Sequence, residues 1–490
     1  MPTTPDLRLG LRTDAPVRET GDFVLYWMTA ARRTHFNHAL DHAVARARDL
    51  GKPLVILEDL RSGRRWDSDR GHRFLLDGMA GMARRLAEKP LVYYPYVEPK
   101  KGDADGLVPA LAERACVVVA DAYPCSYWPE IVEHAAKRVS VRMEQVDACG
   151  LLPMLAAEKT FKTAASFRRF LQGALPEHLS AMPTQDPLAN LDLPRLGSLP
   201  KSITQTWPAA PEALLEGGTR GLGDLDIDHT VAPAPETGGE TAASRTLRTF
   251  LRDRLARYAD GHNHPDEDAC SDLSPYLRAG HISVHRVFAE LAAAQGWSPD
   301  RLGEPTGSRS GWWGMEENAE AFLDELVTWR ELGYNFCHRR DDFADYNSLP
   351  DWAQQTLADH AADPRDERYG LDALSAAETG DPLWNASQRQ LVRTGRLHNY
   401  MRMLWGKKIL AWSPSPQEAA ERMVDLNNRF ALDGRNPNSY TGIFWCLGRY
   451  DRPWGPERPV FGKIRYMTSD SARRKLRLTK YLETFGPDTA

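Results

Sequence analysis

Five short, uninterrupted apolar runs occur within the first 150 residues, and amphipathic stretches separate most of them. A strand that is buried on both faces of a sheet has this pattern, because no solvent-facing side imposes polar alternation. Strand–helix–strand repetition predicts a parallel sheet with right-handed crossovers. The predicted strands are 23–27, 54–57, 91–94, 116–120 and 139–143, and the predicted helices are 38–50, 73–88 and 127–137. The sequence therefore predicts a doubly wound α/β domain over residues 20–180.

The turn after the first predicted strand lacks the glycines of a dinucleotide-binding loop. It reads Tyr26-Trp27-Met28-Thr29-Ala30, whereas that loop needs G-x-G-x-x-G so that the backbone can approach a pyrophosphate. We therefore expect no Rossmann dinucleotide site here. In an open sheet of this type, ligands bind beyond the carboxyl ends of the strands.

The chain changes character twice after this domain. Residues 181–245 carry closely spaced prolines and two Gly-Gly pairs, which predicts an interdomain linker. This linker is long for a loop, so we expect it to pack along the domains. Residues 246–485 have apolar side chains at i, i+3, i+4 spacing and predict an all-helical domain. The helices expected there are 246–257, 283–295, 317–332, 388–412 and 417–430.

Charge and tryptophan are unevenly distributed along the chain. The whole sequence has 62 Lys and Arg against 67 Asp and Glu, a net charge of −5, whereas residues 386–480 have 19 against 7, a local balance of +12. Ten of the 14 tryptophans lie beyond residue 290. A basic, Trp-rich region on an acidic chain predicts a face that binds a polyanion.

The composition also indicates the compartment. No apolar run reaches the ~18 residues of a membrane span, and the N-terminus lacks the apolar segment of a secretory signal. The six cysteines are scattered, without C-x-x-C spacing, which disfavours a zinc site or a disulfide scaffold and fits a reducing environment. We expect a cytoplasmic monomer with no metal, no membrane contact and no obligate protein partner.

Four segments each have a structural and a functional interpretation. The turn at Cys270–Ser274 supplies hydroxyls and N–H groups suited to phosphate, although an ordinary helix cap is the commoner case. Trp405 and Trp412 are two helical turns apart and can pass an electron hole or simply fill the core. Residues 427–440 suit the rim of a flat ligand or a plain loop. Residues 442–467 interleave aromatics with Arg and Lys, as nucleic-acid contacts or as a charged surface.

Taken together, these segments resemble the photolyase/cryptochrome flavoproteins, specifically the class II cyclobutane pyrimidine dimer photolyases. The resemblance is specific over about residues 250–480 and looser over the α/β half. The matching stretches are Leu273–Leu277, Trp329–Leu332 with Asn335–Cys337, Asp381–Asn385, Arg402–Leu410, Leu432–Arg435 and Phe461–Met467. Two stretches depart from it: Arg278-Ala279-Gly280-His281 replaces the more usual His-Phe-Gly-Gln, and Ser308–Gly314 has no assigned role.

The resemblance implies a fold, a cofactor and an activity. The family fold is an α/β domain, a long linker and a helical FAD domain, as predicted above. Reduced FAD absorbs light and passes an electron to a pyrimidine dimer flipped out of DNA, because the dimer is otherwise inaccessible within the base stack. DNA containing pyrimidine dimers is the expected partner, so the protein is expected at the nucleoid when bound. Whether the α/β domain binds a deazaflavin antenna, a folate antenna or neither stays open.

Two other functions remain as alternatives. A cryptochrome-like photoreceptor would bind FAD without repairing DNA. A repair enzyme for the 6-4 photoproduct would need a proton donor, typically His, beside the lesion, and the predicted lesion contacts include none.

The resemblance also implies residue roles. FAD contacts are expected from Tyr258, Cys270, Ser271, Asp272, Leu273, Ser274, Arg402, Asn427, Asp433, Gly434 and Arg435. Arg402 and Asp433 are expected to form an ion pair beside the flavin ring, and the amide of Asn427 to face its reactive nitrogen. Catalytic lesion contacts are expected from Glu325, Trp329, Met403 and Trp445, with the two indoles sandwiching thymine faces. DNA contacts are expected from Trp329, Trp445, Arg452, Trp454, Lys463 and Arg465, of which Trp454 and Arg465 fill the space left by flipping. Electron transfer to the flavin is expected through Trp405, Trp384 and Trp412.

Overall fold

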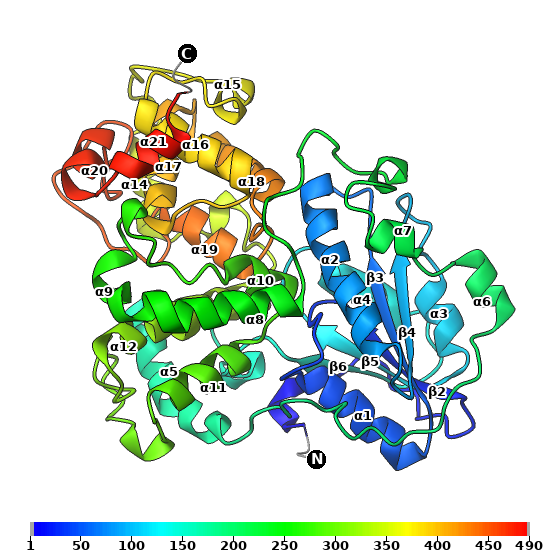
Figure 1. The fold of residues 1–490 in the computed structure, drawn as a ribbon. Helices are drawn as coiled ribbons and strands as arrows, with labels where there is room; N and C mark the ends of the chain where they lie inside the picture. Colours follow the sequence, from blue (N-terminus) through cyan, green and yellow to red (C-terminus); the bar gives the residue numbers. More distant parts are fainter. Residues whose placement is uncertain (1–3, 488–490) are drawn as a thin grey trace. The chain divides into compact units, whose positions relative to one another are not determined.

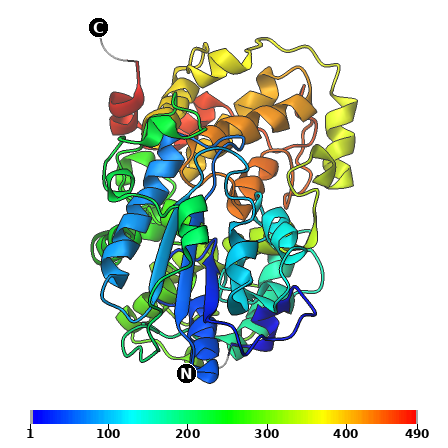
Figure 2. The same cartoon turned by 90° about the vertical axis from the view of Figure 1, so that its right-hand side faces the viewer.

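The computed structural model describes residues 4–487, which form two compact units (Figures 1 and 2). Unit 1 contains the residues up to Glu158, Ala174–Leu247 and Leu273–Asp300. Unit 2 contains Lys159–Gly173, Arg248–Asp272 and the residues from Arg301 onward. The units are therefore interleaved along the chain, and the three-part division predicted from the sequence stays a prediction.

Unit 1 is built on a six-stranded sheet with the strand order β1-β6-β5-β2-β3-β4 (Figure 1). All neighbouring strands are parallel except β1 and β6, so the predicted doubly wound α/β architecture is confirmed. The strands are β1 Leu9–Leu11, β2 Phe23–Met28, β3 Leu54–Leu60, β4 Val92–Val97, β5 Ala115–Ala122 and β6 Met143–Asp147.

The last strand begins later than the sequence predicts. The predicted strand covers 139–143, whereas β6 starts at Met143, so the two share only that residue. Val141 is buried in the core but lies outside the hydrogen-bonded strand. The strand itself is polar, and its buried Glu144 is paired with His42 and Arg46. The apolar pattern therefore predicted correctly that this segment is buried, but it did not predict the residues that form the strand. The short strand β1 was not predicted, since three residues show no period.

The two faces of the sheet carry separate hydrophobic cores. Alternate residues of β2 point to opposite faces, as strand geometry requires. One face is covered by α3 (Leu107–Ala112) and α4 (Trp128–Ala136), and the other by α1 (His38–Leu50) and the end of α2 (Asp69–Leu86). Leu188 and Leu193 of the linker join the second core, whereas Leu199 and Ile203 join the first. The linker therefore packs on both faces of the sheet, as its length predicted.

The strand order reverses between β2 and β5, where an open α/β sheet usually binds its ligand. In unit 1 this position is closed by Asp121, at the end of β5. Its Oδ2 accepts hydrogen bonds from the backbone N–H groups of Thr29, Ala30 and Ala31 at 2.9, 2.7 and 2.8 Å, and its Oδ1 accepts one from the Tyr26 hydroxyl. The amides that would meet a phosphate are thus occupied by a carboxylate. This arrangement agrees with the missing glycine motif.

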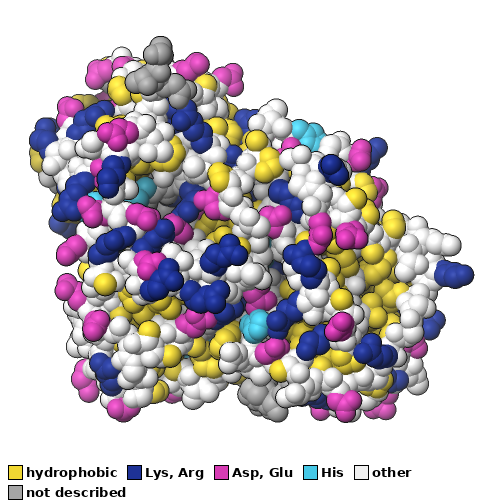
Figure 3. All heavy atoms as spheres, viewed as in Figure 1, with side chains coloured by type: hydrophobic (Ala, Val, Ile, Leu, Met, Phe, Trp, Pro, Cys, Tyr) yellow, Lys and Arg dark blue, Asp and Glu magenta, His cyan; other side chains and the backbone are white. Residues whose placement is uncertain are grey.

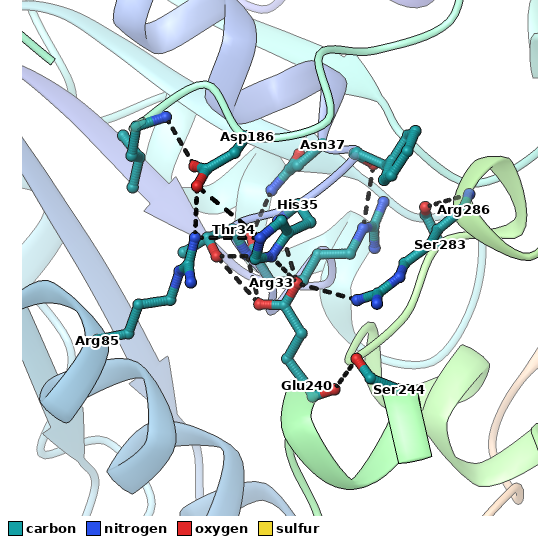
Figure 4. Close-up of polar contacts among 12 residues, drawn as sticks. Arg33, Thr34, His35, Asn37, Arg85, Asp186, Glu240, Ser244, Ser283 and Arg286 are labelled. Carbon is teal, nitrogen blue, oxygen red and sulfur yellow. Dashed lines mark hydrogen bonds and ion pairs between the residues drawn. The ribbon is translucent and has the colours of Figure 1, made fainter. Parts of the chain in front are cut away.

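A second carboxylate attaches α8 (Glu240–Thr249) to the loop after β2 (Figure 4). Glu240 accepts hydrogen bonds from the backbone N–H groups of Thr34 and His35 and from both side chains. Beyond the His35 ring, Arg85 pairs with Asp186 of the linker at 2.8 Å. Burial alone would raise the pKa of Glu240, but the bonds from His35 and Thr34 outweigh it and lower that pKa. The network therefore anchors the linker and the start of α8.

Gly280 occupies a position in unit 1 that no other residue fits. It ends α10 (Ser274–Ala279) with φ +78°, and a Cβ there would lie 1.7 Å from the backbone oxygen of Ala30. We expect Gly280→Ala to destabilise the protein by at least about 3 kcal/mol, because strain at positive φ adds to a backbone clash. Thermal or urea unfolding measures this change. Gly81→Ala, in the middle of α2 with open space around it, is the control and should stabilise by up to about 1 kcal/mol. A mild Gly280→Ala phenotype would contradict the close approach.

The remaining helices confirm a helical C-terminal region, with three differences from the predicted ranges. Residues 388–412 are two helices, because Gly395 adopts a left-handed cap (φ 70°). Residues 246–257 and 317–332 are each interrupted by a π-helix, at Phe250–Arg254 and at Asp324–Trp329 (η8). The helices are α5 Ala164–Leu179, α6 Lys201–Thr206, α7 Glu212–Leu215, α9 Tyr258–Gly261, α11 Val284–Ala294, α12 Glu317–Leu323, α13 Arg330–Arg339, α14 Asp351–Asp359, α15 Leu371–Ser375, α16 Pro382–Thr394, α17 Asn399–Trp412, α18 Pro416–Phe430, α19 Pro437–Trp445, α20 Ser469–Lys475 and α21 Thr479–Phe485. None of the described helices has the length and hydropathy of a membrane span.

Candidate flavin- and lesion-binding site

Three polar side chains meet where α17, α18 and the turn after α18 come together in unit 2. Arg402 of α17 forms the predicted ion pair with Asp433 of the turn, with 3.3 Å between Nη2 and Oδ1. The other guanidinium nitrogen donates to the side-chain oxygen of Asn427 on α18. Arg402 and Asn427 are buried, so the pair is shielded from bulk water. A buried cation, an amide and a carboxylate together can bind the carbonyl and N–H edge of a heterocycle.

The turn that carries Asp433 is fixed by its own backbone contacts. Gly434 packs so tightly that a Cβ would lie 3.0 Å from two carbonyl oxygens at the end of α18. Arg435 adopts φ 59°, and its N–H donates to the side chain of Asn428 at 2.8 Å. The hydroxyl of Ser439 donates to the backbone oxygen of Asp433. Gly434 and Arg435 therefore orient Asp433 toward Arg402.

Glu325 lies in the π-helix η8, one turn before Trp329. π-Helices are rare in proteins, and those that occur often lie at functional sites. Among the described residues the Glu325 carboxyl has no hydrogen-bond or ion-pair partner, although its side chain is only partly exposed. Burial, together with the neighbouring Asp324, raises the pKa of Glu325 to about 7, while Arg309 and Arg168 act in the opposite direction. Both the neutral and the charged form of Glu325 are therefore accessible near neutral pH, and the carboxyl is available to a ligand.

Two of the predicted phosphate contacts lie near this carboxyl. Burial raises the pKa values of Tyr258 and Cys270, and the Glu325 charge raises both further. The Tyr258 ring stacks on that of His262, with 4.7 Å between centroids. Leu273 and Ser274 belong to unit 1 as the N-cap and first residue of α10. Their role as cofactor contacts stays a prediction.

Asp272 adopts an unusual conformation within the same segment. Its φ is +61°, which is uncommon outside glycine, asparagine and aspartate. Its carboxylate is paired with both Arg254 and Arg396. Two guanidinium groups thus converge beside the half-buried Ser271. Such a pair of arginines has the chemistry to hold a diphosphate.

The two predicted lesion-binding indoles are in direct contact. Trp329 and Trp445 stack with 4.6 Å between ring centroids and an angle of 18° between planes. In this structure the two rings are too close for a base to lie between them, since that needs about twice the ~3.5 Å contact distance between facing rings; the expected thymine sandwich stays a prediction. Both indoles are partly exposed, as is Met403 on α17. The sulfur of Cys446, next to Trp445, lies 3.9 Å from the Met403 backbone oxygen. The indole pair thus presents one aromatic wall beside Met403.

The three predicted electron-transfer tryptophans form a connected path. Trp384 of α16 donates its indole N–H to the Trp405 backbone oxygen at 3.0 Å and packs edge-on against Trp412, with 5.3 Å between centroids. Trp405 donates to Gln388 at 2.8 Å. Trp412 in turn contacts the partly exposed Tyr369, at 5.0 Å. The path therefore runs from buried rings to one that reaches solvent.

The predicted DNA contacts form a second group after α19. The guanidinium groups of Arg452 and Arg465 both contact the Trp454 ring, at 4.1 and 4.2 Å from its centroid. Asp451 holds the group together, since it pairs with Arg465 at 3.0 Å and accepts the Trp454 indole N–H at 3.1 Å. Lys463 joins this group through its backbone oxygen, which accepts the Trp454 backbone N–H at 2.9 Å, while its side chain pairs with Glu457. The Asp451 group presents two cations and an aromatic face, which suits a nucleic-acid backbone and a base.

The charge surplus of residues 386–480 does not mark every surface of the protein. The face seen in Figure 3 carries basic and acidic side chains next to one another. Part of the surplus is offset by acidic side chains from outside the segment, for example where Glu267 pairs with the exposed Arg477. The local balance of +12 is therefore a weaker guide to the DNA-binding surface than the Asp451 group.

Sequence reasoning assigned no role to Asp451, Gln388 and Tyr369, although Asp451 lies within the aromatic and basic segment 442–467. Each of the three contacts a side chain that is distant along the chain or brought close by a turn. Asp451 follows Tyr450, which has φ +64°; the clustering of Trp454 and Arg452 was the only signal that could have indicated it.

Comparisons with known proteins identify the family of the chain. A family model described as DNA photolyase matches residues 24–188. The chain is 33% identical over 465 residues to a deoxyribodipyrimidine photo-lyase of Methanothermobacter thermautotrophicus, covering 94% of both chains. It is 31% identical over 477 residues to the enzyme of that name from Arabidopsis thaliana, covering 95% of this chain and 89% of the relative. The corresponding protein of Potorous tridactylus is 30% identical, with coverages of 97% and 83%.

Two solved structures have the same fold. A class III photolyase from Agrobacterium tumefaciens superposes with a TM-score of 0.67 at 19% identity, over 95% of this chain and 86% of that one. A cryptochrome from Synechocystis gives 0.65 at 14% identity, over 96% and 89%. The chain therefore belongs to the DNA photolyase family. The relatives that it matches along nearly their full length carry the name deoxyribodipyrimidine photo-lyase.

Proposed function

We propose that this protein is a light-driven DNA repair enzyme that splits cyclobutane pyrimidine dimers, of the class II type that its sequence resembles. The observation that carries the proposal is the unpartnered Glu325 carboxyl beside the partly exposed Trp329–Trp445 wall, in the same unit as the largely buried Arg402–Asp433 pair. This arrangement provides a lesion-binding and a cofactor-binding part within unit 2.

The residues of unit 2 fit FAD as the cofactor. Arg402, Asn427 and Asp433 supply a cation, an amide and a carboxylate for the edge of the flavin ring. Arg254 and Arg396 supply guanidinium groups for the diphosphate. When bound, reduced FAD would supply the light-excited electron that opens the cyclobutane ring.

The protein's own side chains bind and orient the lesion. The indole pair stacks on a flipped thymine, an interaction worth ~1–3 kcal/mol per base. Glu325 meets the thymine edge, where a neutral carboxyl can donate to the C4 oxygen and accept from N3–H at once. Arg452, Trp454 and Arg465 contact the duplex from which the dimer has been removed. The buried guanidinium of Arg402 favours negative charge on the neighbouring ring.

A cryptochrome-like photoreceptor is the alternative function, since the solved structures with this fold include a cryptochrome. Purified protein should show flavin absorption bands that bleach under blue light with a thiol. Added thymine-dimer oligonucleotide should then recover its absorbance near ~260 nm. Flavin bleaching without recovery would favour the photoreceptor, and repair of a 6-4 substrate would overturn the lesion assignment. An absorption band beyond that of the flavin would identify an antenna.

We further propose that the enzyme works as a monomer in the cytoplasm, which size-exclusion chromatography and fractionation can test.

The pKa of Glu325 predicts how lesion binding depends on pH. The neutral carboxyl predominates below about 7, so we expect affinity for dimer DNA to fall as the pH rises through this value, when the donated hydrogen bond is lost. The loss should be about tenfold, as for a hydrogen bond that involves a charged or buried group.

Glu325→Gln is the matched control for this prediction, since its amide keeps one donor and one acceptor but does not titrate. Fluorescence anisotropy with a dimer oligonucleotide should give a flat profile for this variant between about pH 6 and 8. A wild-type profile that is equally flat would contradict the role of the neutral carboxyl.

A further inference from the structure

A buried lysine lies behind the indole wall and has no assigned role. Lys407 of α17 is 4% exposed. Its ammonium group donates one hydrogen bond, to the backbone oxygen of Cys446 at 2.6 Å. Among the described residues no carboxylate comes within ion-pair distance of it. Burying a charge without a counter-ion costs free energy of folding, so packing alone does not account for a lysine at this position.

The atom that Lys407 contacts belongs to the end of a functional helix. Cys446 is the C-cap of α19, and Trp445 is the last residue of that helix. The carbonyl groups at a helix end lack partners within the helix and carry partial negative charge. No other group of the described residues donates to the Cys446 oxygen. Lys407 thus supplies both the missing donor and a positive charge to the carboxyl end of α19.

The packing around this contact is close and connects it to the lesion residues. Gly406 permits α17 and α19 to approach, since a Cβ there would lie 2.5 Å from the Cys446 sulfur. Lys407 lies one helical turn beyond Met403, on the same face of α17. The end of α19 is therefore held at the point where its indole stacks on Trp329.

We propose that Lys407 is a positioning residue for lesion recognition, which caps α19 and thereby holds Trp445 in the orientation that accepts the flipped base. This inference rests on the proposed function. It adds a residue that touches neither lesion nor flavin and acts through the indole.

The charge state of Lys407 provides a readout that a purely structural role would not change. Burial lowers its pKa to about 8. The titratable groups that act on it are Cys446, Asp451 and Arg465. Burial raises the pKa of the Cys446 thiol, and bonds from Arg465 and Trp454 lower that of Asp451. Lys407 is therefore the group of this set that titrates just above neutral pH.

The experiment measures affinity for a dimer oligonucleotide and for its undamaged counterpart, with flavin-loaded protein. Lys407→Met should lose about tenfold in dimer affinity, as expected when the helix end loses a charged donor. Its affinity for undamaged DNA and its flavin content should not change. Lys408→Gln is the matched control, because the adjacent lysine pairs with Asp381 instead and its loss should leave dimer affinity unchanged.

Lys407→Gln separates the hydrogen bond from the charge and keeps the test decisive if the Met variant does not fold. The ratio of wild-type to Lys407→Gln affinity should fall about threefold between about pH 7.5 and 9.5, as the ammonium is neutralised. Titration of Glu325 is common to both proteins and cancels. A constant ratio, or a folded Lys407→Met variant that binds dimers like wild type, overturns the proposal. Wild-type protein without any preference for dimers overturns the proposed function itself.

Discussion

Trp405→Phe is expected to abolish light-driven reduction of the bound flavin while leaving repair by chemically reduced enzyme intact. Phenylalanine keeps an aromatic ring in the site but is far harder to oxidise, so it interrupts the path that continues through Trp384, Trp412 and Tyr369. Trp405 is 1% exposed and donates to Gln388, and the variant therefore also loses one buried hydrogen bond, worth about 1 kcal/mol.

The measurement is bleaching of flavin absorption under blue light with a thiol, followed by repair of dimer DNA after reduction with dithionite. Trp207→Phe is the control, since Trp207 is a partly exposed residue of unit 1 that donates to the Asp103 backbone oxygen. The control should bleach like wild type. If Trp405→Phe bleaches at the wild-type rate, the electron path lies elsewhere; if dithionite fails to restore repair, Trp405 has a role in binding.

The fold was largely predictable because its signals are local. Continuous apolar runs and helical periodicity identified the parallel sheet and the helical region. The errors arose where tertiary contacts override local preference. The strand β6 is polar because His42 and Arg46 neutralise Glu144, and no sequence window of a few residues contains that information. The interruption at Gly395 depends on a single residue within an otherwise regular helical period, and the π-helix at η8 leaves no mark in that period.

The candidate site was predictable only through the family resemblance. Trp405 and Trp412 alone are indistinguishable from core residues, and nothing in their spacing places Trp384 beside them. The structure adds the supporting contacts: Asp451 pairs with Arg465, and Lys407 donates to the backbone oxygen next to Trp445. Such supporting residues are far along the chain from the groups that they hold, so short motifs cannot reveal them. The direct stacking of Trp329 on Trp445 was not predictable for a related reason, since the spacing of two rings is set by how their helices pack.

Arg168→Met is expected to destabilise the protein by about 3–5 kcal/mol, because it removes one member of a buried ion pair and leaves a carboxylate without a counter-ion. Arg168 of α5 contacts Asp324 of η8 with two parallel bonds, of 2.7 and 2.9 Å. Their side chains are 5% and 11% exposed. Urea unfolding followed by tryptophan fluorescence measures the change. Arg309→Met is the matched control: this exposed arginine also acts on Glu325, but its loss should change stability by less than about 0.5 kcal/mol.

The double variant Arg168→Met with Asp324→Leu tests whether this ion pair only stabilises the protein or also shifts the pKa of Glu325. Stability should return to near the wild-type value, since replacing both ions by apolar groups removes the uncompensated charge. The pH at which dimer affinity declines should move downward, because Asp324 raises the pKa of Glu325 more than Arg168 lowers it. A double variant with restored stability and an unchanged pH profile would show that the pair holds η8 in place without tuning Glu325. Failure to restore stability would instead mean that η8 depends on the geometry of these two bonds, so that the π-helix and the ion pair form a single structural unit.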